Sequence, residues 1–278
     1  MNMNIYKPKI DRQSKHVGLF CNARDETHIK EWAAHHLLIG FDNIIIFDHK
    51  SHIPLKDVFS NFDKRVLIVK TDLPDGNIKQ KLMNYATKLA NKLSLDWFIY
   101  LDADEFLILN NKFRCVKHFL NTYSYGDSVG VNWLMFGSNY LVKEPSGTIL
   151  ESYTRSCNNL DRHVKSFVRP REIVHSDNPH YYHMRNKSRM IGLGMNTLKS
   201  PQCFSEFNIP FYKSTAYIAH YVFQSEESYL KRKVNLIGDD GIQRSNMGKD
   251  IHNHYNDVEN LQAQKYINQI KEFLKYYS

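Results

Sequence analysis

Strand-like and helix-like patterns alternate along the first hundred residues. Four short apolar runs predict buried strands, at residues 17–21, 43–47, 66–69 and 97–101. Apolar residues at helical spacing predict two amphipathic helices, over residues 29–37 and 78–93, and Gly40 supplies a stop for the first. This order of strands and helices predicts an α/β fold with a mixed, mainly parallel sheet flanked by helices.

The second half of the chain is less regular. Residues 155–190 are basic and rich in histidine. Ser225 has the character of a helix N-cap, and the spacing after it predicts a helix that ends at Gly238. No low-complexity linker or internal repeat divides the chain, so we expect one continuous domain.

A pair of carboxylates follows the fourth predicted strand. Asp102 and Asp104 are two positions apart, and residues at that spacing on an extended chain point the same way. Oxygen pairs of this kind suit a hard divalent cation such as Mg²⁺ or Mn²⁺, which keeps positions open for phosphate oxygens. The pattern predicts a metal–diphosphate site at a strand end, although a bare Asp-x-Asp also occurs in solvated acidic turns.

Polar residues stand at three of the predicted strand ends. They are Arg24 with Asp25, Asp48, and Asp102 with Asp104. Because ligands of such sheets bind beyond the carboxyl ends of the strands, we expect these side chains to line one crevice. The sequence contains neither the G-x-G-x-x-G pattern of dinucleotide-binding folds nor a P-loop, which excludes those two routes to phosphate binding.

Charge and cysteine content narrow the class of protein. The 37 basic and 29 acidic residues give a net charge of +8, which favours an anionic partner such as a nucleotide diphosphate, a nucleic acid or an acidic glycan or membrane surface. The four cysteines show no C-x-x-C spacing and are expected to be free thiols. The N-terminus shows no signal peptide, and no stretch approaches the roughly 18 apolar residues of a membrane span. These features predict a cytoplasmic protein.

Several blocks of sequence together match one group of enzymes. They are Arg24-Asp25, Glu31-Trp32, His36, Gly40-Phe41-Asp42, Asp48, Gln80, Asn84-Tyr85, and residues 96–106, 133–138, 165–170 and 219–227. On these blocks, which extend from about residue 17 to 235, the chain resembles the GT-A glycosyltransferases of the family 2-like group, close to glycosyltransferase family 92. That group usually has Asn-Glu in place of Arg24-Asp25, and a Ser/Asp/Gly-rich turn in place of residues 49–54. These departures leave the nucleotide base open.

The resemblance implies a fold and its division. We expect a GT-A (Rossmann-like) fold as a single glycosyltransferase domain over residues 1–278. Residues 17–110 would form the nucleotide-sugar-binding half, and residues 111–240 the half that binds the acceptor and completes the metal site. Residues 256–278 would form a C-terminal helix.

The resemblance also implies roles for individual residues. Asp102 and Asp104 would hold Mn²⁺ or Mg²⁺ at the donor diphosphate, and His220 is either their third protein ligand or a core histidine. Six residues are expected at the nucleotide-sugar: Arg24, Asp25, Asp48, Gln80, Asp102 and Lys165. Asp48 would bond the ribose or base unless it only caps its strand, and Lys165 would clamp the diphosphate from the basic stretch around it.

An inverting enzyme needs a carboxylate that deprotonates the acceptor hydroxyl. Asp239 and Asp240, in Gly-Asp-Asp-Gly, and Glu206 are the candidates, with a surface turn as the alternative for each. His180 and His183 lack companion Cys or His residues at a zinc-site spacing, so acceptor stacking or a structural role is favoured for them.

The resulting prediction is a metal-dependent glycosyltransferase, of hexosyltransferase type, that moves a sugar from a nucleotide-diphosphate donor. UDP-sugar is the favoured donor, inversion the favoured outcome, and a glycan, a protein or another hydroxyl compound the acceptor. Three alternatives stay open: a sugar transferase acting on modified DNA bases, a metal-dependent phosphodiesterase or nuclease, and a non-catalytic GT-A binding module. Steep salt dependence of duplex DNA binding would favour the first of these.

Overall fold

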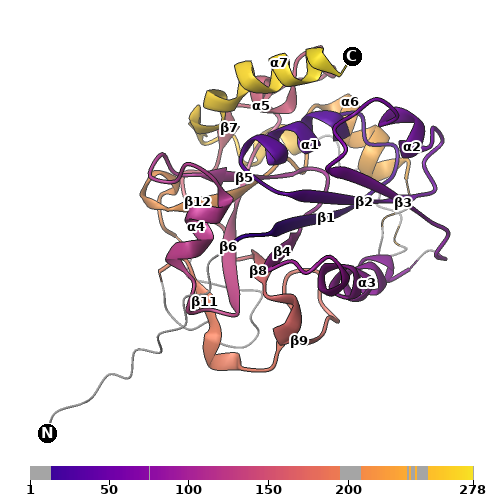
Figure 1. The fold of residues 1–278 in the computed structure, drawn as a ribbon. Helices are drawn as coiled ribbons and strands as arrows, with labels where there is room; N and C mark the ends of the chain where they lie inside the picture. Colours follow the sequence, from indigo (N-terminus) through magenta and orange to yellow (C-terminus); the bar gives the residue numbers. More distant parts are fainter. Residues whose placement is uncertain are drawn as a thin grey trace, which may run out of the picture.

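A curled, mixed β-sheet forms the centre of the protein (Figure 1). The computed structural model describes residues 14–74, 76–194, 208–236, 238, 242 and 250–277. Within these residues the sheet has nine strands, in the order β3-β2-β1-β4-β8-β6-β12-β5, with β11 beside β6. Their bounds are β1 Val17–Ala23, β2 Asn43–His49, β3 Val66–Thr71, β4 Trp97–Tyr100, β5 Glu105–Leu109, β6 Ser128–Met135, β8 Val164–Val168, β11 Met190–Gly192 and β12 Ala216–His220.

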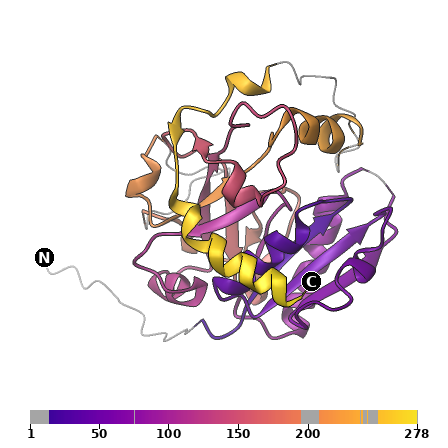
Figure 2. The ribbon, with the colours of Figure 1, turned by 90° about the horizontal axis from the view of Figure 1, so that it is seen from above.

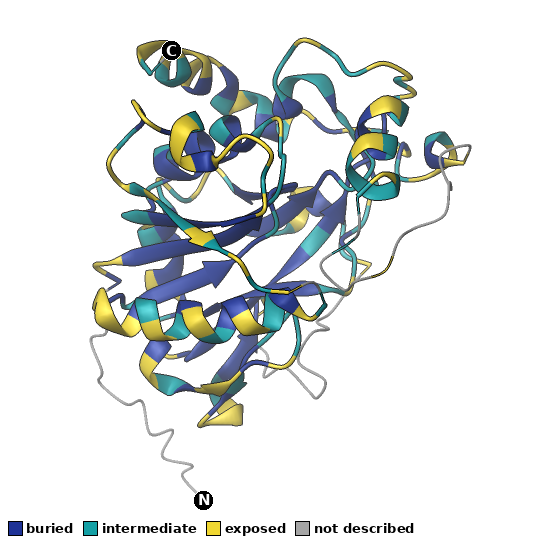
Figure 3. Ribbon diagram, turned by 90° about the vertical axis from the view of Figure 1, so that its right-hand side faces the viewer, coloured by how far each residue is buried: buried dark blue, intermediate teal, exposed yellow. Residues whose placement is uncertain are grey.

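The first four strands are parallel, with β1 between β2 and β4 and with β3 outside β2. Side chains alternate between the two faces, as strand geometry requires. Leu19 and Cys21 of β1 belong to one hydrophobic core, whereas Phe20 belongs to the other. Burial of both faces explains the continuous apolar runs of these strands, and Figure 3 shows the sheet buried under its helices.

Helices cover both faces of the sheet. α1 (Ile29–Leu38) and α7 (Ile267–Tyr276) lie on one face, and α3 (Ile78–Lys92) lies on the other. Seen from above, α7 crosses the sheet beside α1 (Figure 2). The predicted α/β class and mainly parallel sheet are therefore confirmed.

Strands from the second half of the chain extend the same sheet beyond β4. β8 runs antiparallel between β4 and β6, and β12 lies between β6 and β5. β4 and β5 stand apart in the strand order although only residues 101–104 connect them. Because the five steps from Tyr100 to Glu105 span at most about 18 Å, the sheet curls and brings the end of β4 close to the end of β12 and the start of β5. Asp102 and Asp104 lie in this connection.

Smaller elements complete the fold. They are α2 Leu55–Val58, α4 Val116–Thr122, α5 Ile149–Ser152, α6 Glu226–Tyr229 with a π-helical turn Leu230–Val234, β7 Arg155–Ser156, β9 Ile173–His175, β10 His183–Met184, β13 Val258–Glu259, and short 3₁₀ turns at Pro170–Glu172, Lys187–Arg189, Phe211–Lys213, Ile251–Asn253 and Gln262–Tyr266.

Two predicted helices differ from the observed ones. Ser225 caps α6 as predicted, since its Oγ accepts a hydrogen bond from the Ser228 backbone N–H at 3.1 Å, but the helical segment ends at Val234. The C-terminal helix begins only at Ile267. β13 pairs with β7 ahead of it, and the buried Asn260 side chain accepts from the Gln262 backbone N–H at 3.1 Å. Tertiary pairing outweighs helical periodicity there.

Two further predictions concern cysteines and membranes. Cys21, Cys115 and Cys157 are free thiols as predicted, and Cys203 lies outside the described residues. Among the described helices, none combines the length and the apolar character needed to cross a bilayer.

Candidate active site

A cavity of about 410 Å³ opens at the carboxyl ends of β1, β4 and β12. Its lining combines charged residues from five segments with an apolar wall of Val222 and Phe223. The charged and amide side chains are Asn22, Arg24 and Glu26 at the end of β1, Lys79 and Gln80 at the start of α3, Asp102 and Asp104 after β4, His220 at the end of β12, and Arg232 and Lys233 after α6. The predicted convergence of strand ends on one crevice is therefore observed for β1 and β4, with β12 added.

Asp102 is ion-paired on both of its oxygens. Lys79 Nζ lies 2.5 Å from Oδ1, and Lys165 Nζ lies 3.2 Å from Oδ2. Burial disfavours the charged carboxylate, but Lys165 and Lys79 outweigh it and hold the pKa of Asp102 well below its usual range. Asp102 is therefore an anion at neutral pH.

Glu105 stabilises the turn between β4 and β5 that carries the two aspartates. Its Oε2 accepts a hydrogen bond from the Asp102 backbone N–H at 2.9 Å and lies 3.5 Å from Lys165 Nζ. Burial, reinforced by the charge of Asp102, raises the pKa of Glu105 to about 8 against the opposing pull of Lys165. The neutral carboxyl can thus fill the space under the two aspartates without adding a third negative charge.

Asp104 carries a second pair of cations. Arg232 Nη2 and Lys233 Nζ lie 2.7 and 2.9 Å from its Oδ2. Burial opposes ionisation, yet Lys233, His220 and Arg232 together hold the pKa of Asp104 below its usual range. Arg232 also bridges to Glu26, whose Oε2 lies 3.2 Å from its Nε. Four cationic side chains therefore surround the two aspartates.

His220 stands beside Asp104, with its Nε2 at 3.6 Å from Oδ1. Burial lowers its pKa to about 4 despite the attraction of Asp104, so the imidazole is neutral at neutral pH. The ring packs on Trp133 at a centroid distance of 4.5 Å. Its buried Nδ1 has no hydrogen-bond partner among the described residues.

Two ionised carboxylates and a neutral imidazole are a donor set that Mn²⁺ and Mg²⁺ accept. The orphaned ring nitrogen of His220 is consistent with a ligand role. The ligand atoms of Asp102, Asp104 and His220 are not all within 4.8 Å of one another. Among the described residues, the three ligand-type side chains that meet this distance lie elsewhere in the fold. The residue types fit such a cation, and binding it would require the three side chains to close in.

Three of the six predicted donor-binding residues line the cavity, Asp102 among them, and two others bond to a loop instead. Arg24 and Gln80 line the cavity, and Arg24 Nε is buried with no hydrogen-bond partner among the described residues. Asp25 accepts from the backbone N–H of His52 at 2.7 Å and also pairs with its ring. Asp48 accepts the backbone N–H groups of Ser51 at 3.2 Å and of Leu55 at 2.9 Å. These contacts cap the loop after β2.

Lys165 lies behind Asp102 and is only 1% exposed. It is absent from the cavity lining, as is Arg169, which stacks on Trp97 at 4.2 Å. Within the basic stretch, Lys165 thus neutralises the Asp102 carboxylate from the protein interior, and Arg169 packs there on Trp97.

The predicted catalytic bases Asp239, Asp240 and Glu206 lie outside the described residues. Gly238, which precedes Asp239, does line the cavity.

Sequence reasoning missed Lys79, Arg232, Lys233 and Glu26. Arg232 and Lys233 contact Asp104 across more than a hundred positions of sequence, so no local pattern joins them. The basic run 231–233, three residues beyond the family-like block 219–227, was the available signal.

Residues 18–260 match the sequence model of glycosyltransferase family 92. The chain belongs to this family. A glycosyltransferase family 92 protein from Oryza sativa subsp. japonica is 24% identical over 175 residues, which cover 61% of this chain and 30% of that protein. The chain thus spans about a third of that relative's length. The resemblance predicted from the sequence blocks is confirmed.

Solved structures give weaker similarities. HddC from Yersinia pseudotuberculosis aligns with a TM-score of 0.37 and 13% identity, over 78% of this chain and 97% of that one. A cytidylyltransferase from Leptospira borgpetersenii serovar Hardjo-bovis aligns with a TM-score of 0.29 and 9% identity, over 56% of this chain and 60% of that one. At these scores neither similarity bears on function.

Proposed function

We propose that this family 92 protein transfers a sugar from a nucleotide-diphosphate donor, UDP-sugar in the first instance, to a hydroxyl acceptor. The observation that carries the proposal is the pair of ionised aspartates, Asp102 and Asp104, placed at one cavity among four cationic side chains, three of which line that cavity. A diphosphate needs cations and directed N–H donors, and both are present there.

The cavity side of this cluster would bind the phosphates. Lys79, Arg232 and Lys233 line the cavity and point their charged groups at the aspartates. When a diphosphate enters, these groups can pair with its oxygens as well as with the carboxylates. Arg24, with its buried Nε lacking a partner among the described residues, supplies a further donor. Preorganised charge of this kind stabilises the nucleotide as it leaves.

Asp102, Asp104 and His220 would hold the divalent metal. When bound, Mn²⁺ or Mg²⁺ supplies positive charge that neutralises the departing diphosphate. The chain's own contribution is to keep both carboxylates ionised and the imidazole neutral, which are the states that ligands require. The cations that now pair with the aspartates would turn towards the phosphates.

Binding and activation of the acceptor would require the apolar wall of the cavity and a catalytic base. Phe223 and Tyr229 line the cavity as aromatic side chains against which a sugar could pack. Inversion needs a carboxylate at the acceptor hydroxyl. Asp239 and Asp240, which follow the cavity residue Gly238, are proposed for this role, because Glu26 is held by Arg232.

A thermal-shift panel tests the proposal. Nucleotide-sugars with UDP, GDP, CMP or TDP would each be added with Mn²⁺, and a specific donor should raise the melting temperature because it binds the native state. We expect UDP-sugars to give the largest rise. A panel without any shift, combined with hydrolysis of phosphodiesters that shows no sugar preference, would instead establish a phosphodiesterase.

A further inference from the structure

A second cluster of ligand-type side chains lies on the β9–β10 hairpin, outside the cavity lining. His175, Asp177 and His183 each offer one ligand atom, and these atoms all lie within 4.8 Å of one another. Among the described residues, no other three ligand-type side chains lie this close together. We propose that it binds a divalent transition-metal ion of borderline softness, such as Zn²⁺.

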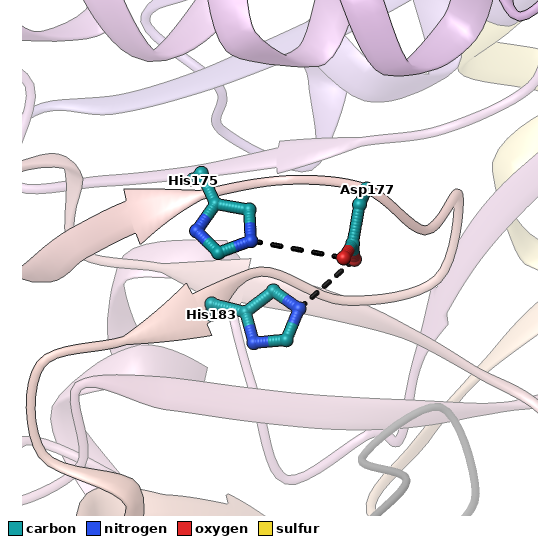
Figure 4. A group of neighbouring side chains, drawn as sticks. All are labelled: His175, Asp177 and His183. Carbon is teal, nitrogen blue, oxygen red and sulfur yellow. Dashed lines mark hydrogen bonds and ion pairs between the residues drawn. The ribbon is translucent and has the colours of Figure 1, made fainter.

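Hairpin pairing brings the two histidines together. His175 and His183 are directly opposed in the antiparallel register, and their rings stack with centroids 4.2 Å apart. Both rings turn a nitrogen towards the Asp177 carboxylate, as Figure 4 shows. His183 Nε2 lies 2.9 Å from Oδ1, and His175 Nε2 lies 3.7 Å from Oδ2.

These distances suit a zinc ion. Bonds of about 2.0–2.1 Å in tetrahedral geometry separate two ligand atoms by about 3.3 Å. The two observed separations bracket this value, so small rotations of the side chains would accommodate the ion. Imidazole nitrogens with one carboxylate favour Zn²⁺ over the hard cations expected at Asp102 and Asp104. With three protein ligands, a fourth position stays open to water.

The backbone that carries the ligands is anchored. Ser176, between His175 and Asp177, is buried and exchanges two hydrogen bonds with Asn84 of α3, at 2.9 and 2.7 Å. Its Oγ also donates to the Tyr181 carbonyl at 3.4 Å. Ligands on an anchored turn lose little freedom on binding, which favours affinity.

The proposed ion would close the loop of residues 176–182 at its base. Pro179 of this loop lines the active-site cavity, and His180 packs on Trp133 at 5.0 Å. A metal at the hairpin would therefore stabilise one wall of the cavity from outside. The inference concerns binding at the hairpin and does not rest on the proposed donor.

Sequence reasoning did not find this site because it examined His183 only with His180. The partner of His183 lies eight positions earlier, across the turn, and spacing along the chain does not show that pairing.

Calorimetry with ZnCl₂ tests the proposal on full-length protein without a histidine tag. Excess Mn²⁺ would be present, because it occupies oxygen-rich sites and leaves the histidine-rich one to zinc. We expect one zinc ion in the wild-type protein. His183→Gln, His175→Gln and Asp177→Asn should each weaken binding at least about tenfold, as loss of even a supporting group does at metal sites.

His52→Gln is the matched control. His52 is an exposed histidine paired with one carboxylate, that of Asp25 at 2.7 Å, and it belongs to no three-ligand group among the described residues. Its zinc affinity should equal that of the wild type. Melting curves without metal would confirm that each variant folds. If a histidine variant does not fold, Asp177→Asn, which changes an exposed side chain, still tests the site. Zinc binding that all three hairpin variants retain, or no zinc binding by the folded wild-type protein, would overturn the proposal.

Discussion

Replacing Lys165 tests whether a buried ion pair contributes more to the stability of this protein than a partly exposed one. The Lys165 side chain is 1% exposed, and its ammonium lies 3.2 Å from Asp102 and 3.5 Å from Glu105. Lys165→Met keeps most of the volume and removes the charge. Asp102 then keeps Lys79 as its remaining partner.

The expected loss follows from the cost of leaving one member of a buried ion pair alone. That cost is roughly 3–5 kcal/mol. We expect the lower end, about 3 kcal/mol, because Asp102 is 25% exposed and keeps one lysine, whereas a Glu105 with its pKa near 8 needs no counter-charge at neutral pH.

Urea unfolding at neutral pH measures this loss, and two further variants sharpen it. Lys117→Met breaks the pair with Asp42, at 2.6 Å but about a third exposed, and should cost less than about 1 kcal/mol. Lys165→Met with Asp102→Asn should be more stable than Lys165→Met alone, since the carboxylate that lost one of its two lysines is then removed. Equal losses in Lys165→Met and Lys117→Met, or no recovery in the double variant, would refute the reasoning.

Two other predictions test the donor contacts and the core. Arg24→Ala should weaken UDP binding about tenfold, the loss of one charged hydrogen bond of roughly 1.5 kcal/mol, with Arg65→Ala unchanged as control; equal affinities would contradict the Arg24 role. Burial raises the pKa of Glu31 to about 7 from its ordinary 4.5. The folded state therefore holds a proton that the unfolded state releases, and stability should fall by roughly 3 kcal/mol as pH rises through that window. Glu31→Gln should flatten this slope, and an unchanged slope in urea unfolding would refute it.

The parallel half of the fold could be predicted because its pattern is local. The apolar runs at 17–21 and 43–47 became β1 and β2, with the added residues Asn22–Ala23 and Asp48–His49 carrying the strands into polar ends. The helix predicted over 78–93 is α3 within one residue. Patterns of period two and 3.6 need no knowledge of the tertiary structure.

The surroundings of the aspartates could not be predicted in the same way. Asp102 and Asp104 were found from their spacing, but the partners that set their charge come from α3, β8 and the segment after α6. Asp48 shows the opposite case. Its place at a strand end suggested a ligand contact, and in the fold both of its oxygens accept backbone N–H groups of the following loop.

The central claim is that Asp102 and Asp104 bind the donor diphosphate together with a metal. Calorimetric titration of UDP with Mn²⁺ into the wild type, Asp102→Asn, Asp104→Asn and Asp42→Asn tests it most directly. Asp42 is the control because it bonds the backbone N–H of Val17, at the amino end of β1. We predict metal-dependent UDP binding that both active-site variants lose and Asp42→Asn keeps. UDP affinity unchanged in either active-site variant would contradict the account.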